Sequence, residues 1–250
     1  RAPLLRRYME RGATGDLKWC STLFPTPAYA LEADMSLRDY DAFVYGACFC
    51  DREDPIAAWQ EIHDKQARVI DWLKGKKDVK VTGPNADLTL SIAGRTFINS
   101  DGHHNMPSGE VYTGPVEDSA NGWVHYTYPA VTGGRVVEGI ELWFEDGKVV
   151  KATAKKNEKY LHQMLETDEG ARYLGEFAIG TNFGIQRFTK QILFDEKIGG
   201  SFHTAVGAGY PETGSQNRSA IHWDMICDMR DGGEIWVDGE LFYQNGKFVI

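Results

Sequence analysis

The chain of 250 residues has the composition of an ordinary globular protein, with 42% hydrophobic and 25% charged residues. Its net charge of -9 argues against nucleic acid as a partner, because phosphate binding depends on clustered lysines and arginines. No apolar run approaches the roughly 18 residues that a membrane span needs, and the opening RAPLLRRYMERG is too charged for a signal peptide. We therefore expect a cytoplasmic protein with no nucleic-acid or membrane partner.

The first 75 residues have patterns that are mainly typical of helix and turn. The chain begins at Arg1, without an initiator methionine and inside an amphipathic helical pattern that ends at Gly12, which suggests a piece of a longer protein. The clearest helix has Asp54 as its N-cap and Pro55 as its first residue, and Gly75 follows as a stop signal. Its apolar residues recur with the helical period (Ile56, Trp59, Ile62, Val69, Ile70 and Leu73). A domain boundary is expected near residue 77.

The pattern changes to alternation after residue 80, which is typical of strands. It appears in DLTLSIAG, RTFINS and VVEGIELWFEDGKVVKATA. The dipeptides Asp146-Gly147, Asp238-Gly239 and Asn245-Gly246 suit tight hairpin turns that need positive φ, so the sheet should be antiparallel. One helix is expected among the strands, over residues 156–169, with Gly170 as its C-cap.

The segment 194–230 contains the most informative cluster of polar residues. Residues 221–226 alternate like a strand, so His222 and Asp224 project to the same face. His203, after two glycines, offers a second imidazole that can reach the same point. A lone histidine is more often structural, but two histidines with carboxylates are the ligand set that zinc, cobalt and manganese favour in hydrolytic sites.

Two glutamates lie in surroundings that are unusual for a solvated charge. Glu110 stands in NMPSGEVYTGP and Glu176 in YLGEFAIGTN, both rich in glycine and apolar residues. A carboxylate in such surroundings is costly unless it is paired or binds a cation. Each glutamate is therefore a candidate metal ligand, with a salt bridge or an exposed turn as the alternative.

Weaker signals come from several other polar residues. Glu196 in FDEK is either a general base or a charge at a strand end, and Tyr210 is a ligand, an oxyanion donor or a packed aromatic. A polar turn is favoured over a metal site at His103-His104, because adjacent strand residues face opposite ways. The remaining histidines are interpreted as structural (His63, His125 and His162). No HExxH, GxSxG or P-loop pattern occurs in the sequence.

Six segments resemble one family, the thermophilic metallo-aminopeptidases of the aminopeptidase T and aminopeptidase S type. They are YMERGATGDLKW, TLFPTPAYALEADMSL, NMPSGEVYTGPVEDSANGWVHY, GEFAIGTNFGI, FDEKIGGSFHTAVGAGYP and NRSAIHWDMICDM, in order over nearly the whole chain. The resemblance implies two divalent metal ions, zinc or cobalt before manganese or magnesium. The ligands that it implies are the same five residues (Glu110, Glu176, His203, His222 and Asp224). Glu196 and Tyr210 match positions associated with catalysis or metal contact.

The resemblance also implies an organisation into two parts. Residues 1–77 would be the mostly helical remnant of an N-terminal α/β domain, and residues 78–250 a largely antiparallel, β-rich catalytic domain. The fold class expected is therefore mixed α/β, of the α+β kind. The family implies peptide substrates with a free N-terminus, and a homodimer at full length.

The function expected is a metal-dependent aminopeptidase, in which two metals activate water. Glu196 would move the proton and Tyr210 would donate to the oxyanion. One alternative is a mononuclear iron oxygenase that uses His203, His222 and Asp224 as a triad. The order of these residues and the two unused glutamates argue against it. Another alternative is a truncated domain without catalytic activity, whose polar cluster is an internal network.

Overall fold

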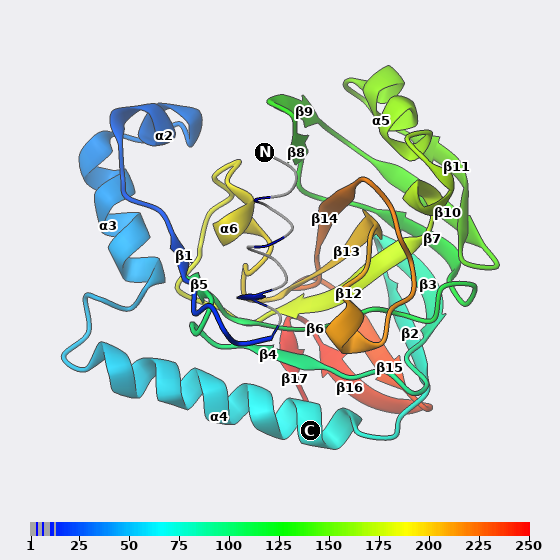
Figure 1. Ribbon diagram of the computed structural model, residues 1–250, viewed down its shortest axis with the longest axis horizontal. Helices are drawn as coiled ribbons and strands as arrows, with labels where there is room; N and C mark the ends of the chain where they lie inside the picture. The colour runs from blue at the N-terminus through cyan, green and yellow to red at the C-terminus, as the bar shows by residue number, and fades with distance from the viewer. Residues whose placement is uncertain (1–3, 5–6, 8–10, 13) are drawn as a thin grey trace.

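Two antiparallel sheets form the body of the protein (Figure 1). The computed structural model describes residues 4, 7, 11–12 and 14–250, so most of the helix expected to end at Gly12 lies outside the described residues. The larger sheet contains, in spatial order, β11 (Lys148–Thr153), β10 (Glu141–Glu145), β7 (Asn121–His125), β3 (Ala86–Ser91), β2 (Asp78–Gly83), β15 (Glu234–Val237), β16 (Glu240–Gln244) and β17 (Lys247–Phe248). The smaller sheet contains β14 (His222–Asp228), β13 (Ser201–Gly207), β12 (Leu174–Gly180), β6 (Glu110–Thr113) and β4 (Ile98–Ser100).

Helices and short strand pairs complete the fold. The helices are α2 (Pro27–Glu32), α3 (Leu37–Ala47), α4 (Pro55–Leu73), α5 (Glu158–Leu165), α6 (Ile192–Asp195) and the 3₁₀ turns η1 (Glu169–Arg172) and η2 (Pro211–Thr213). The short pairs are β1 (Ser21–Thr22) with β5 (Asn105–Met106) and β8 (Ala130–Thr132) with β9 (Arg135–Val137). The mixed α/β fold with large antiparallel sheets is as predicted.

The three predicted hairpin turns are confirmed. Each has its first residue near φ 50° and its glycine near φ 80°: Asp146 at 46° and Gly147 at 80°, Asp238 at 49° and Gly239 at 80°, Asn245 at 49° and Gly246 at 81°. Positive φ at both central positions is the type I′ geometry, whose twist matches that of the flanking strands. These turns connect β10 to β11, β15 to β16, and β16 to β17.

Helix α4 follows its sequence signals closely. The Asp54 carboxylate accepts a hydrogen bond from the Ala57 amide at 2.9 Å, and Gly75 has a φ of 77° just beyond the helix end. Val69 and Leu73 are buried in the main core of the protein. The helix therefore packs directly onto the sheets, and the domain boundary near residue 77 stays a prediction.

The predicted helix over residues 156–169 is too long. Helix α5 ends at Leu165, and Gly170 lies inside η1 instead of capping α5. Asp168 is extended at φ -159°, and its carboxylate accepts hydrogen bonds from the Ser219 hydroxyl at 2.7 Å and the Ala220 amide at 2.6 Å. Bonds to a distant loop thus replace the continuation of the helix.

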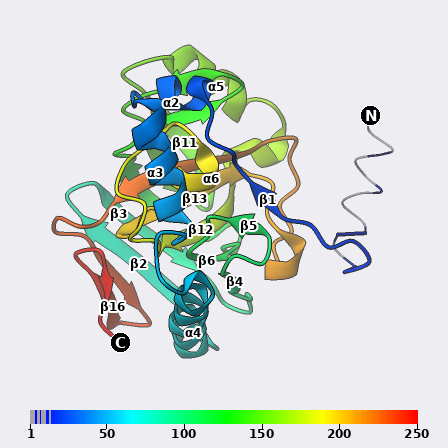
Figure 2. The same cartoon turned by 90° about the vertical axis from the view of Figure 1, so that its left-hand side faces the viewer.

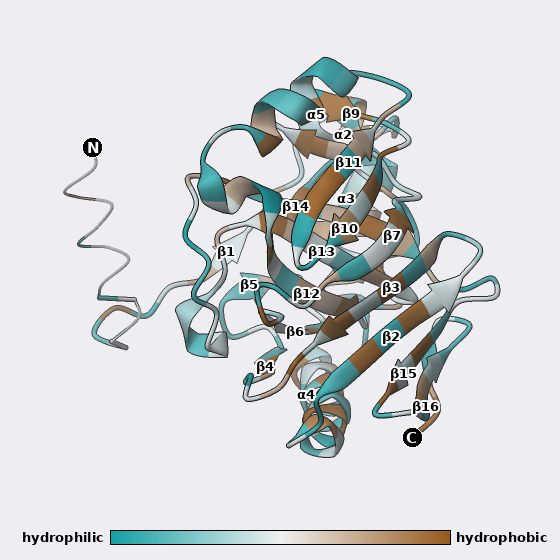
Figure 3. Ribbon diagram, turned by 90° about the vertical axis from the view of Figure 1, so that its right-hand side faces the viewer, coloured by the Kyte–Doolittle hydropathy of each residue, from teal (hydrophilic) through white to brown (hydrophobic). Residues whose placement is uncertain are grey.

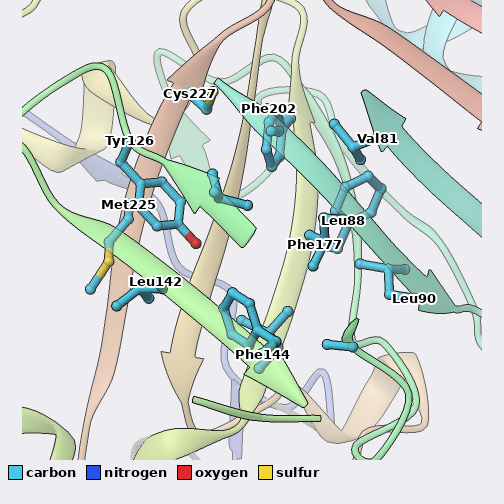
Figure 4. Close-up of a cluster of buried hydrophobic side chains, with 14 of the residues drawn as sticks. Val81, Leu88, Leu90, Tyr126, Leu142, Phe144, Phe177, Phe202, Met225 and Cys227 are labelled. Atoms are coloured by element: carbon cyan, nitrogen blue, oxygen red, sulfur yellow. The ribbon is translucent and has the colours of Figure 1, made fainter. Parts of the chain in front are cut away.

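The main hydrophobic core lies between the two sheets (Figure 4). The smaller sheet contributes Phe177, Phe202 and Met225, and the larger sheet contributes residues such as Leu88 and Leu142. Because side chains alternate along a strand, an apolar face directed to this core leaves the other face of the smaller sheet for different residues.

A second apolar cluster holds α2, α3 and the α6 region together (Figure 2). Tyr40 and Val44 of α3 pack in it with Phe194 of α6 and Ile198 just beyond. This packing fixes the segment that follows α6 beside β12, where Asn182 and Ile198 form a β-bridge.

Hydropathy alternates along β2 and β3 in the middle of the larger sheet, as Figure 3 shows. The side chains of β3 alternate between buried and exposed in the same order, so one face of the strand contacts solvent and the other lies in the core. No helix in the described part of the chain is long and apolar enough to cross a membrane.

The core position of Phe177 gives a stability prediction. Phe177→Ala should lower the free energy of unfolding by about 3–5 kcal/mol, because it removes a large side chain that is 2% exposed. Urea denaturation followed by circular dichroism measures this change. Val150→Ala is the control, since Val150 lies on β11 and is 48% exposed. A loss below about 1 kcal/mol for Phe177→Ala would contradict the assigned core.

Candidate metal centre

The face of the smaller sheet that points away from the main core carries the predicted ligands. Across the ladders, each of them pairs with a glycine or an alanine: Glu110 with Gly180, Glu176 with Ala205, His203 with Ala178, His222 with Gly207, and Asp224 with Ala205. These small partners leave space beside the ligand candidates, while the second neighbours of Glu110 and His203 are Ser100 and Ile226. Its opposite face carries the core residues, so the period of the strands sorts ligand candidates from packing residues.

The five candidates come together. His203 Nε2 lies 3.5 Å from Glu110 Oε2 and 3.8 Å from Glu176 Oε1. His222 Nε2 lies 3.1 Å from Glu176 Oε2 and 3.4 Å from Asp224 Oδ1. Glu176 thus stands between the two imidazoles, which is where a carboxylate shared by two ions would stand.

His222 is oriented by the backbone. Its Nδ1 lies 2.7 Å from the carbonyl oxygen of Ala208, which can only accept, so Nδ1 carries a hydrogen. In the neutral ring the lone pair is then on Nε2, which faces Glu176 and Asp224. A backbone carbonyl that fixes the ring in this way is the usual support of a histidine that binds a metal.

Several buried polar atoms of this cluster have no hydrogen-bond partner. They are Glu110 Oε2, Asp224 Oδ1 and both ring nitrogens of His203, a residue that is fully buried. Such atoms normally cost about 1–3 kcal/mol each when they are left unpaired. Carboxylate oxygens and imidazole nitrogens are ligands for zinc-like cations, so the orphaned atoms fit bound divalent metal.

The mutual attraction within the cluster shifts its pKa values. Burial disfavours charge on His222, but Asp224 and Glu176 outweigh it and raise the pKa of His222 to about 12. For His203, burial is likewise outweighed by Glu176 and Glu110, and its pKa rises to about 9. Burial alone would raise the pKa of Glu176, but the nearby imidazoles of His203 and His222 hold it well below its usual value. Without a cation, these raised pKa values favour the protonated form of both imidazoles at neutral pH.

Glu196 reaches the same cluster from the C-terminal end of α6. Glu196, His203 and Asp224 each offer one ligand atom within 4.8 Å of the other two. Burial raises the pKa of Glu196, and Glu110 and Asp224 add to this, against the opposing attraction of Lys197. A carboxyl group with a raised pKa beside the predicted ligands suits a general base.

Lys197 is a further residue of the cluster, one that no sequence pattern singled out. This side chain is fully buried, donates to Glu196 Oε1, and its Nζ lies 3.5 Å from Glu110 Oε1. A lysine is almost never fully buried unless it is paired. The signal was its position in FDEKIGG, between a candidate base and an apolar, glycine-rich turn.

Tyr210 lies at the rim of the cluster. Its hydroxyl is 3.4 Å from His222 Nε2, and the side chain is partly exposed. Its ring also packs against Tyr112, with ring centroids 5.3 Å apart. Tyr112 was missed too, although it stands two residues after Glu110 and so shares its face of β6.

The other histidines lie outside this cluster. The Asp101 carboxylate lies between two of them, with Oδ2 2.5 Å from His63 Nδ1 and Oδ1 2.6 Å from His103 Nδ1. His104 stacks on Trp19 with ring centroids 4.6 Å apart. The His103-His104 pair is thus the exposed polar turn that the sequence favoured.

The iron triad considered as an alternative is not assembled. In the described part of the chain, three groups have ligand atoms within 4.8 Å of one another: Glu110, Glu176 and His203; Glu176, His222 and Asp224; Glu196, His203 and Asp224. Each group contains a single imidazole, whereas the triad needs two on one ion. The geometry therefore disfavours a mononuclear iron centre.

Comparisons with known proteins show which family the sequence matches. Residues 1–248 match the family described as thermophilic metalloprotease (M29). Aminopeptidase 2 of Geobacillus stearothermophilus is 34% identical over 248 residues, which is 85% of this chain and 60% of that relative. The chain thus spans less than two thirds of the relative's length.

Two solved structures are similar in fold. AmpT from Thermus thermophilus is 26% identical, with a TM-score of 0.75 over 86% of this chain and 59% of that one. The 2,5-dihydroxypyridine dioxygenase from Pseudomonas putida KT2440 is 19% identical, with a TM-score of 0.61 over 79% of this chain and 63% of that one. At this identity the second likeness shows the fold alone.

The protonated imidazoles predict a coupling between metal and protons. Zinc binding at pH 7.5 should release at least one proton, because His203 and His222 must lose theirs to act as ligands. The pKa of His203 is raised to about 9, so the ring is charged below that pH and has a proton to release. As the pH rises through about 9, the ring is already neutral, and zinc binding should release no proton from His203. Calorimetric titration in buffers with different ionisation enthalpies measures the number released.

The control for proton release is His125→Gln, because His125 pairs with Glu141 at 3.3 Å, outside the cluster. This variant should release as many protons as the wild type. Identical heats in all buffers at pH 7.5 would contradict the protonated state of the two imidazoles.

Proposed function

Because the chain belongs to the thermophilic metalloprotease (M29) family, we propose that it acts as a metal-dependent aminopeptidase, which removes the N-terminal residue of peptides. The observation that carries the proposal is the convergence of five predicted ligands on one face of the smaller sheet. The name of the aminopeptidase relative supports the same activity.

The proposed ligands divide between two divalent ions. Glu110 and His203 would bind one ion, His222 and Asp224 the other, and Glu176 would bridge them, as its position between the imidazoles suggests. Zinc or cobalt is preferred over manganese or magnesium, since two imidazoles favour the softer ions. When bound, such ions supply Lewis acidity that activates water and polarises a peptide carbonyl group.

The residues around these ligands would move the protons. Glu196 takes the proton of the attacking water and returns it to the leaving amine, a role that its raised pKa suits. Tyr210 donates its hydroxyl hydrogen to the developing oxyanion from the open side of the cluster. A free α-amine would select the N-terminal residue. The homodimer and the division near residue 77 stay predictions.

Hydrolysis of matched substrates tests the proposal. A leucine nitroanilide with a free amine should be cleaved, while its N-acetylated form should be cleaved at least about 10²-fold more slowly, because acetylation removes the charged amine that the proposed exopeptidase would recognise. A chelator should abolish turnover, and zinc or cobalt should restore it. Asp224→Asn should lower turnover strongly, whereas His125→Gln should not. Equal cleavage of the two substrates, or turnover that survives the chelator, would refute the assignment.

A further inference from the structure

Lys197 owes its position to a close approach of two backbone segments. A Cβ atom on Gly180 would lie 2.3 Å from the carbonyl oxygen of Ile198, so glycine at the end of β12 lets the 197–198 segment lie against the sheet. The Asn182 amide donates to the Lys197 carbonyl at 3.1 Å, and the Asn182 side chain bonds the carbonyl groups of Ala47 and Ser108. The backbone of Lys197 is thereby fixed over the ligand face.

Lys197 has two carboxylate partners, Glu196 and Glu110, which differ in how they can contact a metal ion. It contacts Glu196 closely, and it lies 3.5 Å from Glu110. Glu110 also faces His203, at 3.5 Å, and remains directed toward the proposed ligands. Glu196 stands with His203 and Asp224 in a group that can hold an ion, so it is able to become a ligand itself.

A carboxylate that coordinates a metal is a weaker base, because the cation lowers its pKa and occupies one of its oxygens. Lys197 competes for this carboxylate, since its ammonium group is buried and has few other partners. Among the described residues, it is the one lysine or arginine in an ion pair with the cluster. The charge of Lys197 also opposes a nearby divalent ion, which strengthens the separation.

We infer that Lys197 is a positioning residue that holds the Glu196 carboxylate out of metal coordination and so reserves it for proton transfer. The inference rests on the proposed function for its catalytic part alone. Its structural part, the choice between ion pair and metal ligand, concerns the metal-bound chain whether or not a peptide is cleaved.

A double-mutant cycle tests the inference with wild type, Glu196→Gln, Lys197→Met and the double variant. Zinc affinity is measured by competition with a chelating dye. Lys197→Met should tighten zinc binding by about tenfold or more, because Glu196 becomes an extra charged ligand. In the Glu196→Gln background, the factor by which Lys197→Met tightens zinc binding should be smaller by at least about fivefold, because the extra carboxylate ligand is absent.

Two further readouts separate positioning from simple charge removal. Lys197→Met should lower kcat by roughly 10²-fold with KM within about threefold, because the base is engaged elsewhere. The cobalt-loaded variant should absorb more weakly in the visible range than wild type, as expected when a ligand is added to the metal. Lys197→Gln, which keeps a hydrogen-bond donor but loses the charge, should lie between Lys197→Met and wild type.

Several outcomes would overturn the inference. Equal tightening of zinc binding in both backgrounds would show that Lys197 acts by charge alone. Weaker zinc binding in Lys197→Met would assign Lys197 a purely structural role. Loss of the cooperative thermal unfolding transition in both Lys197 variants would do the same. If wild type binds zinc but cleaves no peptide, the aminopeptidase proposal fails, while the zinc and cobalt measurements still decide the position of Glu196.

Discussion

Repulsion among four carboxylates is the constraint on which this structure depends. Glu110, Glu176, Glu196 and Asp224 lie close together with little access to water, where like charges are costly. Two imidazoles and one buried lysine offset part of the charge, but several ligand atoms remain unpaired. Such an arrangement is stable only in a scaffold that forces it, and bound cations relieve it. The sandwich of sheets is that scaffold, because its core fixes one face of β12, β13 and β14 and leaves the other for the ligands.

The fold by itself does not decide the chemistry. Both AmpT and a dioxygenase share it with this chain, so one scaffold supports different reactions. The difference lies in which polar residues stand on the ligand face and in how they group. Within the described part of this chain, three groups each contain one imidazole, and carboxylates predominate. That composition favours hydrolytic chemistry over a mononuclear iron centre. Neighbouring atoms also orient the ligand candidates: the Ala208 carbonyl accepts a hydrogen bond from His222 and fixes its ring.

Local patterns in the sequence predicted what local physics determines. Strand alternation placed His222 and Asp224 on one face, and the dipeptides that allow positive φ located the hairpin turns. The family resemblance then joined distant residues that no local pattern connects. Lys197 and Tyr112 were missed because their importance comes from contacts across the fold, such as the approach of the 197–198 segment to Gly180. The end of α5 at Leu165 was missed for the same reason, since Asp168 accepts hydrogen bonds from Ser219 and Ala220, which are 51 and 52 residues further along the chain.

Anomalous X-ray diffraction from zinc-loaded crystals, recorded on both sides of the zinc absorption edge, tests the central claim most directly. Two peaks should appear above the ligand face, roughly 3.5 to 4 Å apart, with Glu176 between them. Glu110 and His203 should lie beside one peak, and His222 and Asp224 beside the other. Absence of any peak within reach of these residues at saturating zinc would contradict the account. A single ion bound by both imidazoles would also contradict it.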